Sequence, residues 1–194
     1  EGERWAIGQP SLYVATATLR DAAGHTLSER TERVGFRDAA MQDGTLYLNQ
    51  ARTPLFAVRG QTGLNAPVAA ALVAAGGLNA VELHGAVPTA GWLARYDELG
   101  LPVVYLPRCD GGLWKPGDDE LGIRAANAEA LAEQESRLLA EAAAHPAILA
   151  WACEGADSRR ATTCGGLRRD PMVRPVFGVD LTAAAISGLF APQP

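Results

Sequence analysis

The sequence predicts a mixed α/β fold in which antiparallel strands precede a parallel sheet with helical crossovers. Residues 1–52 consist of short strand-forming runs separated by turns. From residue 53 onward, short apolar runs alternate with helix-forming segments, which is the pattern of parallel strands joined by helices. The last three of these apolar runs contain almost no polar residue, as expected of strands that are covered on both faces.

The antiparallel part is predicted to contain two hairpins. β-Forming residues fill both members of the first pair of strands, and a turn-forming Asp-Ala-Ala-Gly segment separates them. The second pair flanks an Asp-Gly dipeptide, which favours a two-residue hairpin loop. The predicted segments are Ser11–Leu19, the turn Asp21–Gly24, Thr26–Phe36, Ala39–Met41, the turn Asp43–Gly44 and Leu46–Leu48.

Five strands are predicted in the parallel part. Each is a short apolar run bounded by glycine, proline or charged residues. They are Leu55–Val58, Asn79–His84, Pro102–Leu106, Ala147–Ala152 and Pro175–Val179.

Capping residues define the predicted helices between these strands. Pro67–Ala75 begins with proline and is followed by glycine, as is typical of helix ends. Thr89 is the expected N-cap of a helix that runs through Leu99 and ends at Gly100. A longer helix is expected over residues 121–144, where Pro146 ends it, and another begins at about residue 182.

Composition narrows the classes of function. Of 194 residues, 48% are hydrophobic and 20% are charged, and the formal net charge is -5. The basic residues form no stripe that would neutralise phosphates, so we expect no nucleic-acid partner. No run approaches the roughly 20 apolar residues of a membrane span, so we expect no membrane partner. We expect a soluble chain and leave a secreted or periplasmic location open.

No motif for a cofactor or metal is present. The loop Gly60–Asn65 lacks the GxGxxG spacing of dinucleotide-binding sheets, and the sequence has neither a P-loop nor an HExxH motif. Cys109, Cys153 and Cys164 match no zinc or redox spacing, and at most one disulfide can form among them. An open doubly wound sheet would show the same alternation of strands and helices, so periodicity alone leaves the shape of the sheet open.

Short motifs along the chain resemble family 2 glycoside hydrolases and occur in that family's order. The resemblance extends over nearly the whole chain. It is carried by Gln9–Tyr13, Val34–Arg37, Leu46–Gln50, Phe56–Gly60, Gly77–Val81, Tyr96–Val103, His145–Trp151 and Arg169–Val176.

This resemblance implies a particular architecture. Residues 1–52 would be the last strands of an immunoglobulin-like β-sandwich together with a linker. Residues 53–194 would be the first half of a (β/α)8 TIM barrel, comprising strands one to five. The remainder of the parent chain would supply the earlier sandwich strands and the last barrel strands.

The resemblance also implies a retaining two-carboxylate mechanism on β-glycosides in the full-length parent. One carboxylic acid protonates the leaving oxygen and a second carboxylate attacks the sugar, with the two about 5–5.5 Å apart. The family spacing after Trp151 places Ala156 where the acid/base glutamate is expected, so Glu154 is the candidate acid if the strand end is shortened or bulged. Asp157 is an alternative, and loss of the acid is another. The nucleophile would lie on the seventh barrel strand, outside this chain.

Five further residues are candidates for binding the substrate. Arg59, Glu82, His84 and Asp110 fall near the carboxyl ends of predicted strands, where barrel active sites gather. Trp114 lies in the long third loop and could stack on a sugar ring. By the resemblance, Glu82 replaces an arginine that supports the nucleophile, and His84 is close to the family's histidine. The alternatives are a backbone-bonded His84 and a Trp114 that only anchors its loop.

Two main hypotheses and a third follow. The first is that the chain is part of a carbohydrate-cleaving enzyme. The second is that it is part of a non-catalytic relative that binds carbohydrate or serves as a scaffold, and the replacements at Glu82 and Ala156 favour this second hypothesis. An unrelated α/β domain with accidental motif matches is the third. The enzymatic hypothesis applies to the parent protein, because this chain lacks a complete pair of carboxylates.

Overall fold

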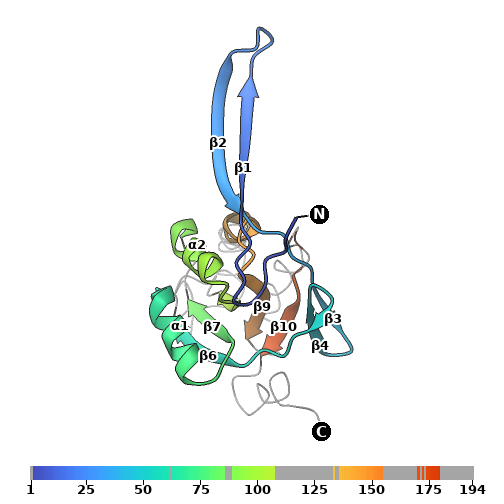
Figure 1. Ribbon diagram of the computed structural model, residues 1–194, viewed down its shortest axis with the longest axis vertical. Helices are drawn as coiled ribbons and strands as arrows, with labels where there is room; N and C mark the ends of the chain where they lie inside the picture. The colour runs from blue at the N-terminus through green and yellow to red at the C-terminus, as the bar shows by residue number, and fades with distance from the viewer. Residues whose placement is uncertain are drawn as a thin grey trace, which may run out of the picture.

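The computed structural model describes residues 2–61, 63–85, 89–107, 133, 136–154, 170, 172 and 174–179. The described part forms one long hairpin, a small antiparallel sheet and a larger parallel sheet with helices beside it (Figure 1). This combination confirms the predicted mixed α/β class. No helix in these ranges is long and apolar enough to cross a bilayer.

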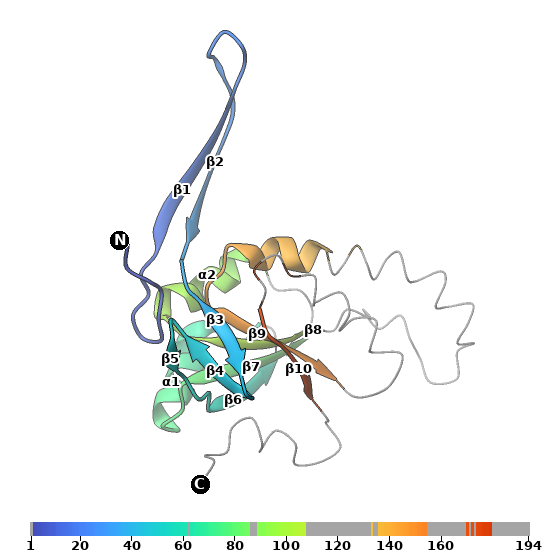
Figure 2. The same cartoon turned by 90° about the vertical axis from the view of Figure 1, so that its right-hand side faces the viewer.

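The long hairpin consists of β1 (Tyr13–Arg20) and β2 (Thr26–Val34), and it projects away from the rest of the molecule (Figures 1 and 2). Its turn is held by Asp21, whose Oδ1 accepts hydrogen bonds from the backbone N–H groups of Ala23 and His25 at 2.9 and 2.8 Å. Most hairpin side chains are exposed, including the apolar Val14, Leu19 and Leu27 at 69%, 61% and 63%. The hairpin therefore contributes little to the core.

The small sheet is formed by β3 (Ala39–Gln42), β4 (Thr45–Leu48) and β5 (Ala51–Arg52). The predicted Asp43-Gly44 loop connects the first two strands, and both of its residues have positive φ, 48° and 74°. That backbone geometry suits the right-handed twist of a hairpin. Leu46 and Leu48 of β4 point into the core.

The parallel sheet has the strand order β10-β9-β8-β7-β6, so that neighbours in space are neighbours in sequence. All four pairings are parallel. The five predicted strands are thus confirmed, with shifted ends. They are β6 (Ala57–Gln61), β7 (Ala80–Gly85), β8 (Val103–Pro107), β9 (Ile148–Glu154) and β10 (Val176–Val179).

The first of these strands begins two residues later than predicted and continues through Gly60 to Gln61. Asn79 explains the late start, because its side-chain amide accepts a hydrogen bond from Phe56 N at 2.7 Å and donates one to Pro54 O at 2.8 Å. The predicted residues Leu55 and Phe56 are therefore held by a side chain before the ladder begins. A Cβ atom at position 60 would lie only 2.7 Å from Leu64 Cδ2, so the close approach of Leu64 favours glycine at this position of the strand.

Two helices pack beside this sheet. Helix α1 (Ala66–Ala75) contacts β6, β7 and α2 (Ala90–Leu99) (Figure 1). The predicted caps of α2 are confirmed: Thr89 Oγ1 accepts a hydrogen bond from Trp92 N, and Gly100 adopts the left-handed conformation. Of the predicted 121–144 helix, residues 136–143 are helical, and most of the rest lies outside the described ranges.

The core lies on and around the parallel sheet. Alternate residues of neighbouring strands in register share a face. One face carries Leu83, Tyr105 and Trp151, and all three side chains are almost fully buried. The opposite face carries Glu82, Val104 and Ala150, which are also buried. Burial of both faces explains why the sequence of these strands is so apolar.

Candidate functional site

Three of the predicted binding residues lie together on β6 and β7. Arg59 and Glu82 are cross-strand partners in register, and His84 lies two residues beyond Glu82 on the same face. Glu82 Oε1 is 3.2 Å from Arg59 Nε and 2.5 Å from His84 Nε2. His84 is therefore bonded to a carboxylate rather than to the backbone. We refer to Arg59, Glu82 and His84 as the strand-end cluster.

The charge of Glu82 is stabilised within this cluster. Its side chain is only 7% exposed, and burial raises the pKa of a carboxyl group. The hydrogen bond from His84 and the positive charge of Arg59 outweigh that effect, so that the pKa of Glu82 lies below its ordinary value. Glu82 is thus an ionised hydrogen-bond acceptor at neutral pH and does not serve as a proton donor there.

The neighbouring strands continue this face with apolar side chains. Val104 of β8 is in register with Glu82, and Ala150 of β9 is in register with Val104. Val104 and Ala150 are buried, as is Leu106. The polar part of the described face is therefore concentrated on the first two strands. No three His, Cys, Asp or Glu residues within the described ranges are grouped as metal ligands.

The other predicted site residues are placed only in part. Glu154 is the last residue of β9 and pairs in register with Val179, but its side chain is outside the described part. Asp110 and Trp114 lie outside the described residues, as do Ala156 and Asp157. The same holds for Cys109 and Cys164 and for the side chain of Cys153.

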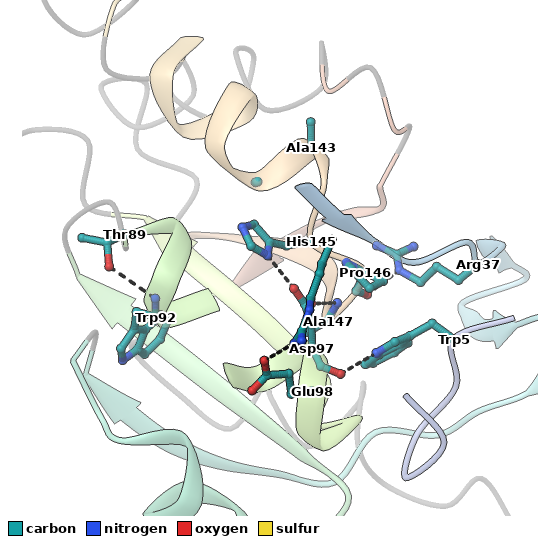
Figure 3. Close-up of polar contacts among 12 residues, drawn as sticks. Trp5, Arg37, Thr89, Trp92, Asp97, Glu98, Ala143, His145, Pro146 and Ala147 are labelled. Carbon is teal, nitrogen blue, oxygen red and sulfur yellow. Dashed lines mark hydrogen bonds and ion pairs between the residues drawn. The ribbon is translucent and has the colours of Figure 1, made fainter. Parts of the chain in front are cut away.

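A second polar cluster, which the sequence analysis did not predict, joins the amino-terminal end of the sheet to α2 (Figure 3). Asp97, the third-last residue of α2, is buried and accepts two hydrogen bonds through its carboxylate. His145 Nδ1 lies 2.5 Å from Oδ2, and Ala147 N donates to Oδ1 at 2.8 Å. Asp97 therefore ties the end of α2 to the segment that leads into β9.

The N-terminal segment is attached at the same place. Trp5 is fully buried, and its Nε1 donates to the backbone oxygen of Asp97 at 2.9 Å (Figure 3). Arg37 donates to the carbonyl oxygens of Pro146 and Ile148. Burial and the nearby charge of Arg174 lower the pKa of Arg37 to about 9. We refer to Trp5, Arg37, Asp97 and His145 as the amino-end junction.

A buried ion pair supports the neighbouring strand. Arg174 Nη1 is 2.9 Å from Asp170 Oδ2, and both side chains are 1% exposed. Asp170 Oδ2 also accepts from Trp151 Nε1 at 2.7 Å, and the guanidinium of Arg174 lies 5.5 Å from the centre of the Trp151 ring. These contacts make Trp151 a core residue, as expected from its apolar strand.

The two clusters lie toward opposite ends of the strands and differ in what they can do. In parallel α/β sheets, ligands bind at the carboxyl ends of strands, and conservation at the amino end reflects stability. In the amino-end junction, Trp5, Asp97 and His145 are correspondingly buried, Arg37 is partly buried, and all four side chains have hydrogen-bond partners within the protein. No spacing in the sequence links Asp97 to His145, which are separated by 48 positions. The strand-end cluster, in contrast, retains a half-exposed Arg59 at 46%.

Comparison with known proteins agrees with the motif resemblance. Residues 1–37 match the family description "Glycosyl hydrolases family 2". No curated protein sequence matches the chain significantly.

Among solved structures, a Ruminococcus gnavus β-glucuronidase in complex with N1-substituted uronic isofagomine has a TM-score of 0.74 at 14% identity, and the alignment covers 91% of this chain and 33% of that one. A family 2 glycosyl hydrolase from Bacteroides cellulosilyticus has a TM-score of 0.70 at 20% identity, and the alignment covers 98% of this chain and 27% of that one. A β-galacturonidase from Eisenbergiella tayi bound to galacturonate has a TM-score of 0.71 at 20% identity, with 91% and 34% covered.

At these identities the structural likeness concerns the fold. The chain spans about one third of the length of the β-glucuronidase and β-galacturonidase chains. The match over residues 1–37 and the shared fold together confirm the resemblance to family 2 glycoside hydrolases.

Proposed function

We propose that this chain is part of a family 2 glycoside hydrolase whose substrate, a β-glycoside, binds at the carboxyl ends of the parallel strands. The observation that carries the proposal is the strand-end cluster: Arg59 and Glu82, the third residues of β6 and β7, pair across the sheet, and His84 continues their face toward the carboxyl ends, where such folds bind ligands. Similar structures in complex with uronic acids or their analogues support a carbohydrate as the ligand.

We propose further that the five parallel strands are the first five of a (β/α)8 barrel. Their consecutive order supports this, because a doubly wound sheet reverses its strand order at a switch point and none occurs among β6–β10. Residues 53–194 would then be the first half of the barrel. Residues 1–52 would be the last strands of a β-sandwich and its linker, a role that suits a hairpin whose apolar side chains are exposed.

The proposed chemistry is the retaining mechanism, with two carboxylates about 5–5.5 Å apart. Glu154 is the candidate acid/base, and its position as the last residue of β9 supports that role. The nucleophile would come from the remainder of the parent chain. Glu82 is assigned a binding role, since its lowered pKa makes it a poor acid.

A panel of chromogenic β-galactosides, β-glucuronides and β-mannosides tests this proposal on the full-length protein. We expect turnover of at least one substrate. Glu154→Gln should then reduce kcat by about 100-fold or more, because the leaving oxygen loses its proton donor. The exposed Glu141→Gln on the helical segment 136–143 is the matched control and should leave kcat unchanged. Absence of turnover on every glycoside would eliminate the enzymatic proposal.

A second candidate function is carbohydrate binding without catalysis. The apolar Val104 and Leu106 on β8, together with the pairing of Glu82 inside the strand-end cluster, favour it, because they leave few free charged groups on the described face. Binding of simple sugars without turnover would support this candidate over the hydrolase.

A further inference from the structure

Arg59 presents a guanidinium group that is only partly used by the protein. Its Nε is 3.2 Å from Glu82 Oε1, and its side chain is 46% exposed. No contact among the described residues occupies the two terminal amino groups. The edge formed by these two groups is the one that can bind a planar carboxylate through two parallel hydrogen bonds.

The rest of the strand-end cluster holds this guanidinium in place. Glu82 is 7% exposed and remains ionised, and His84 Nε2 fixes the same Oε1 atom at 2.5 Å. Because Arg59 is anchored through Nε, little side-chain freedom is lost when a ligand binds. A guanidinium that is preorganised and half-exposed is suited to recognition of an anionic group rather than to stabilisation of the fold alone.

We infer that Arg59 binds the carboxylate of an acidic sugar, with Glu82 and His84 as positioning residues. This inference rests on the proposed function, namely that the site takes a carbohydrate. A sugar hydroxyl accepts a single hydrogen bond from Arg59, whereas a carboxylate accepts two parallel hydrogen bonds in which donor and acceptor are both charged.

A singly charged carboxylate fits this site better than a phosphate. Arg59 and Glu82 together carry no net charge. The cluster therefore attracts an anion through the hydrogen bonds that Arg59 can donate more than through long-range electrostatic attraction. A phosphate dianion would place a second negative charge near ionised Glu82, which would repel it more than it repels a singly charged carboxylate.

Ligand-observed NMR titrations of the full-length protein test the inference. The probes are D-glucuronate and D-galacturonate, the matched neutral sugars D-glucose and D-galactose, glucose 6-phosphate, and acetate. We expect each uronate to bind roughly 10- to 100-fold more tightly than its neutral counterpart, the range expected of charge-assisted hydrogen bonds. Acetate and glucose 6-phosphate should bind more weakly than the uronates.

Substitutions of Arg59 test whether its guanidinium causes the preference for uronates over neutral sugars. Arg59→Gln should abolish the preference for uronates and leave the affinity for neutral sugars within about threefold. Arg59→Lys retains the charge beside Glu82 but lacks the planar edge, so it should keep the fold and lose most of the preference. Arg30→Gln, at a side chain of β2 that is 81% exposed, is the control and should change nothing.

The outcomes separate this inference from the proposed function. Equal binding of uronates and neutral sugars would overturn the inference and leave carbohydrate binding intact. A preference that survives in both Arg59 variants would also overturn it, as would tighter binding of glucose 6-phosphate. If neither acidic nor neutral sugars bind, the proposed function and the inference fail together.

Discussion

Glu82 shows how a buried carboxylate can be retained on a largely apolar strand. Its partner in register on β8, Val104, and its neighbours along β7, Val81 and Leu83, are apolar, yet two nitrogen donors, Arg59 Nε and His84 Nε2, converge on one of its oxygens. A buried charge is tolerated when it is paired and hydrogen-bonded. The resemblance expects an arginine at this position, which would remove the acceptor that orients both partners.

The lowered pKa of Glu82 leads to a prediction about pH. A carboxyl group whose pKa is lower in the folded state contributes stability above the unfolded pKa of about 4.3, and this contribution is lost as the pH falls through the folded value. Glu82→Gln should therefore lower the free energy of unfolding by about 1–3 kcal/mol at pH 7. In urea denaturation, the difference from wild type should shrink below pH 4.

Glu32→Gln on β2, at a side chain that is 40% exposed, is the matched control and should show no comparable loss at pH 7. A loss for Glu82→Gln that stays constant down to acidic pH would show that packing, rather than charge, is the cause.

The sequence alone predicted part of this residue-level picture. Arg59, Glu82 and His84 could be nominated because they fall near the ends of the predicted strands, although β6 continues to Gln61, and Arg59 and Glu82 are the third residues of their strands. Their mutual contacts could not, because those depend on the register between β6 and β7. The amino-end junction escaped prediction for the same reason: Asp97 and His145 are brought together by tertiary packing and show no local pattern.

At the scale of elements, α2 is the part that local rules describe best. Thr89 and Gly100 were predicted as its caps, and both occupy those positions. Gly100 has a φ of 61°, and a Cβ there would lie 2.8 Å from Gly8 N. Glycine is therefore favoured at this position for two reasons: the backbone is left-handed, and the N-terminal segment packs too closely to leave room for a Cβ.

Two glycine substitutions separate these requirements. Gly77→Ala, at a φ of 64° with open space around it, should cost about 1–2 kcal/mol through backbone strain alone. Gly100→Ala should cost about 1–3 kcal/mol more, because the N-terminal segment must also move. Thermal unfolding of the two variants measures the difference, and equal losses would show that the contact with Gly8 is unimportant.

The joint between α2 and β9 depends on one carboxylate. Asp97→Ala leaves His145 and Ala147 N without their buried acceptor and should cost about 3–5 kcal/mol. The adjacent Glu98 is 31% exposed and pairs with Arg33 and Arg95 at the surface, so Glu98→Ala should cost less than about 1 kcal/mol. Urea denaturation compares the two, and similar losses would contradict the assigned role of Asp97.

At the scale of the whole molecule, alternation of apolar runs and helices predicted the parallel sheet, and the structure confirms its five strands. The order of the strands was beyond sequence reasoning without the resemblance, because an open sheet has the same local pattern. Asp110, Trp114 and Ala156 lie outside the described residues, so their sequence-based roles are predictions.

The projecting hairpin gives a prediction at this scale. A two-stranded hairpin on its own is marginally stable in water, and local opening exposes it to proteases. In the 194-residue chain, trypsin should cut readily within β1 and β2, for example after Arg20 or Arg30. In the full-length protein, where we propose that further sandwich strands cover the hairpin, cleavage there should be much slower. Equal cleavage rates would contradict that arrangement.

The consecutive order of β6 to β10 has a consequence for how the protein is made. During synthesis, every strand from β7 onward emerges after a strand with which it pairs, so the sheet can grow one strand at a time from β6. Pairing only between strands that follow one another in the chain keeps the sequence separation of the contacts lower than in a sheet whose strand order is permuted. Asp97 on α2 is synthesised before His145, so the contact between them forms only after the segment that leads into β9 has been made, and it then holds β9 in place.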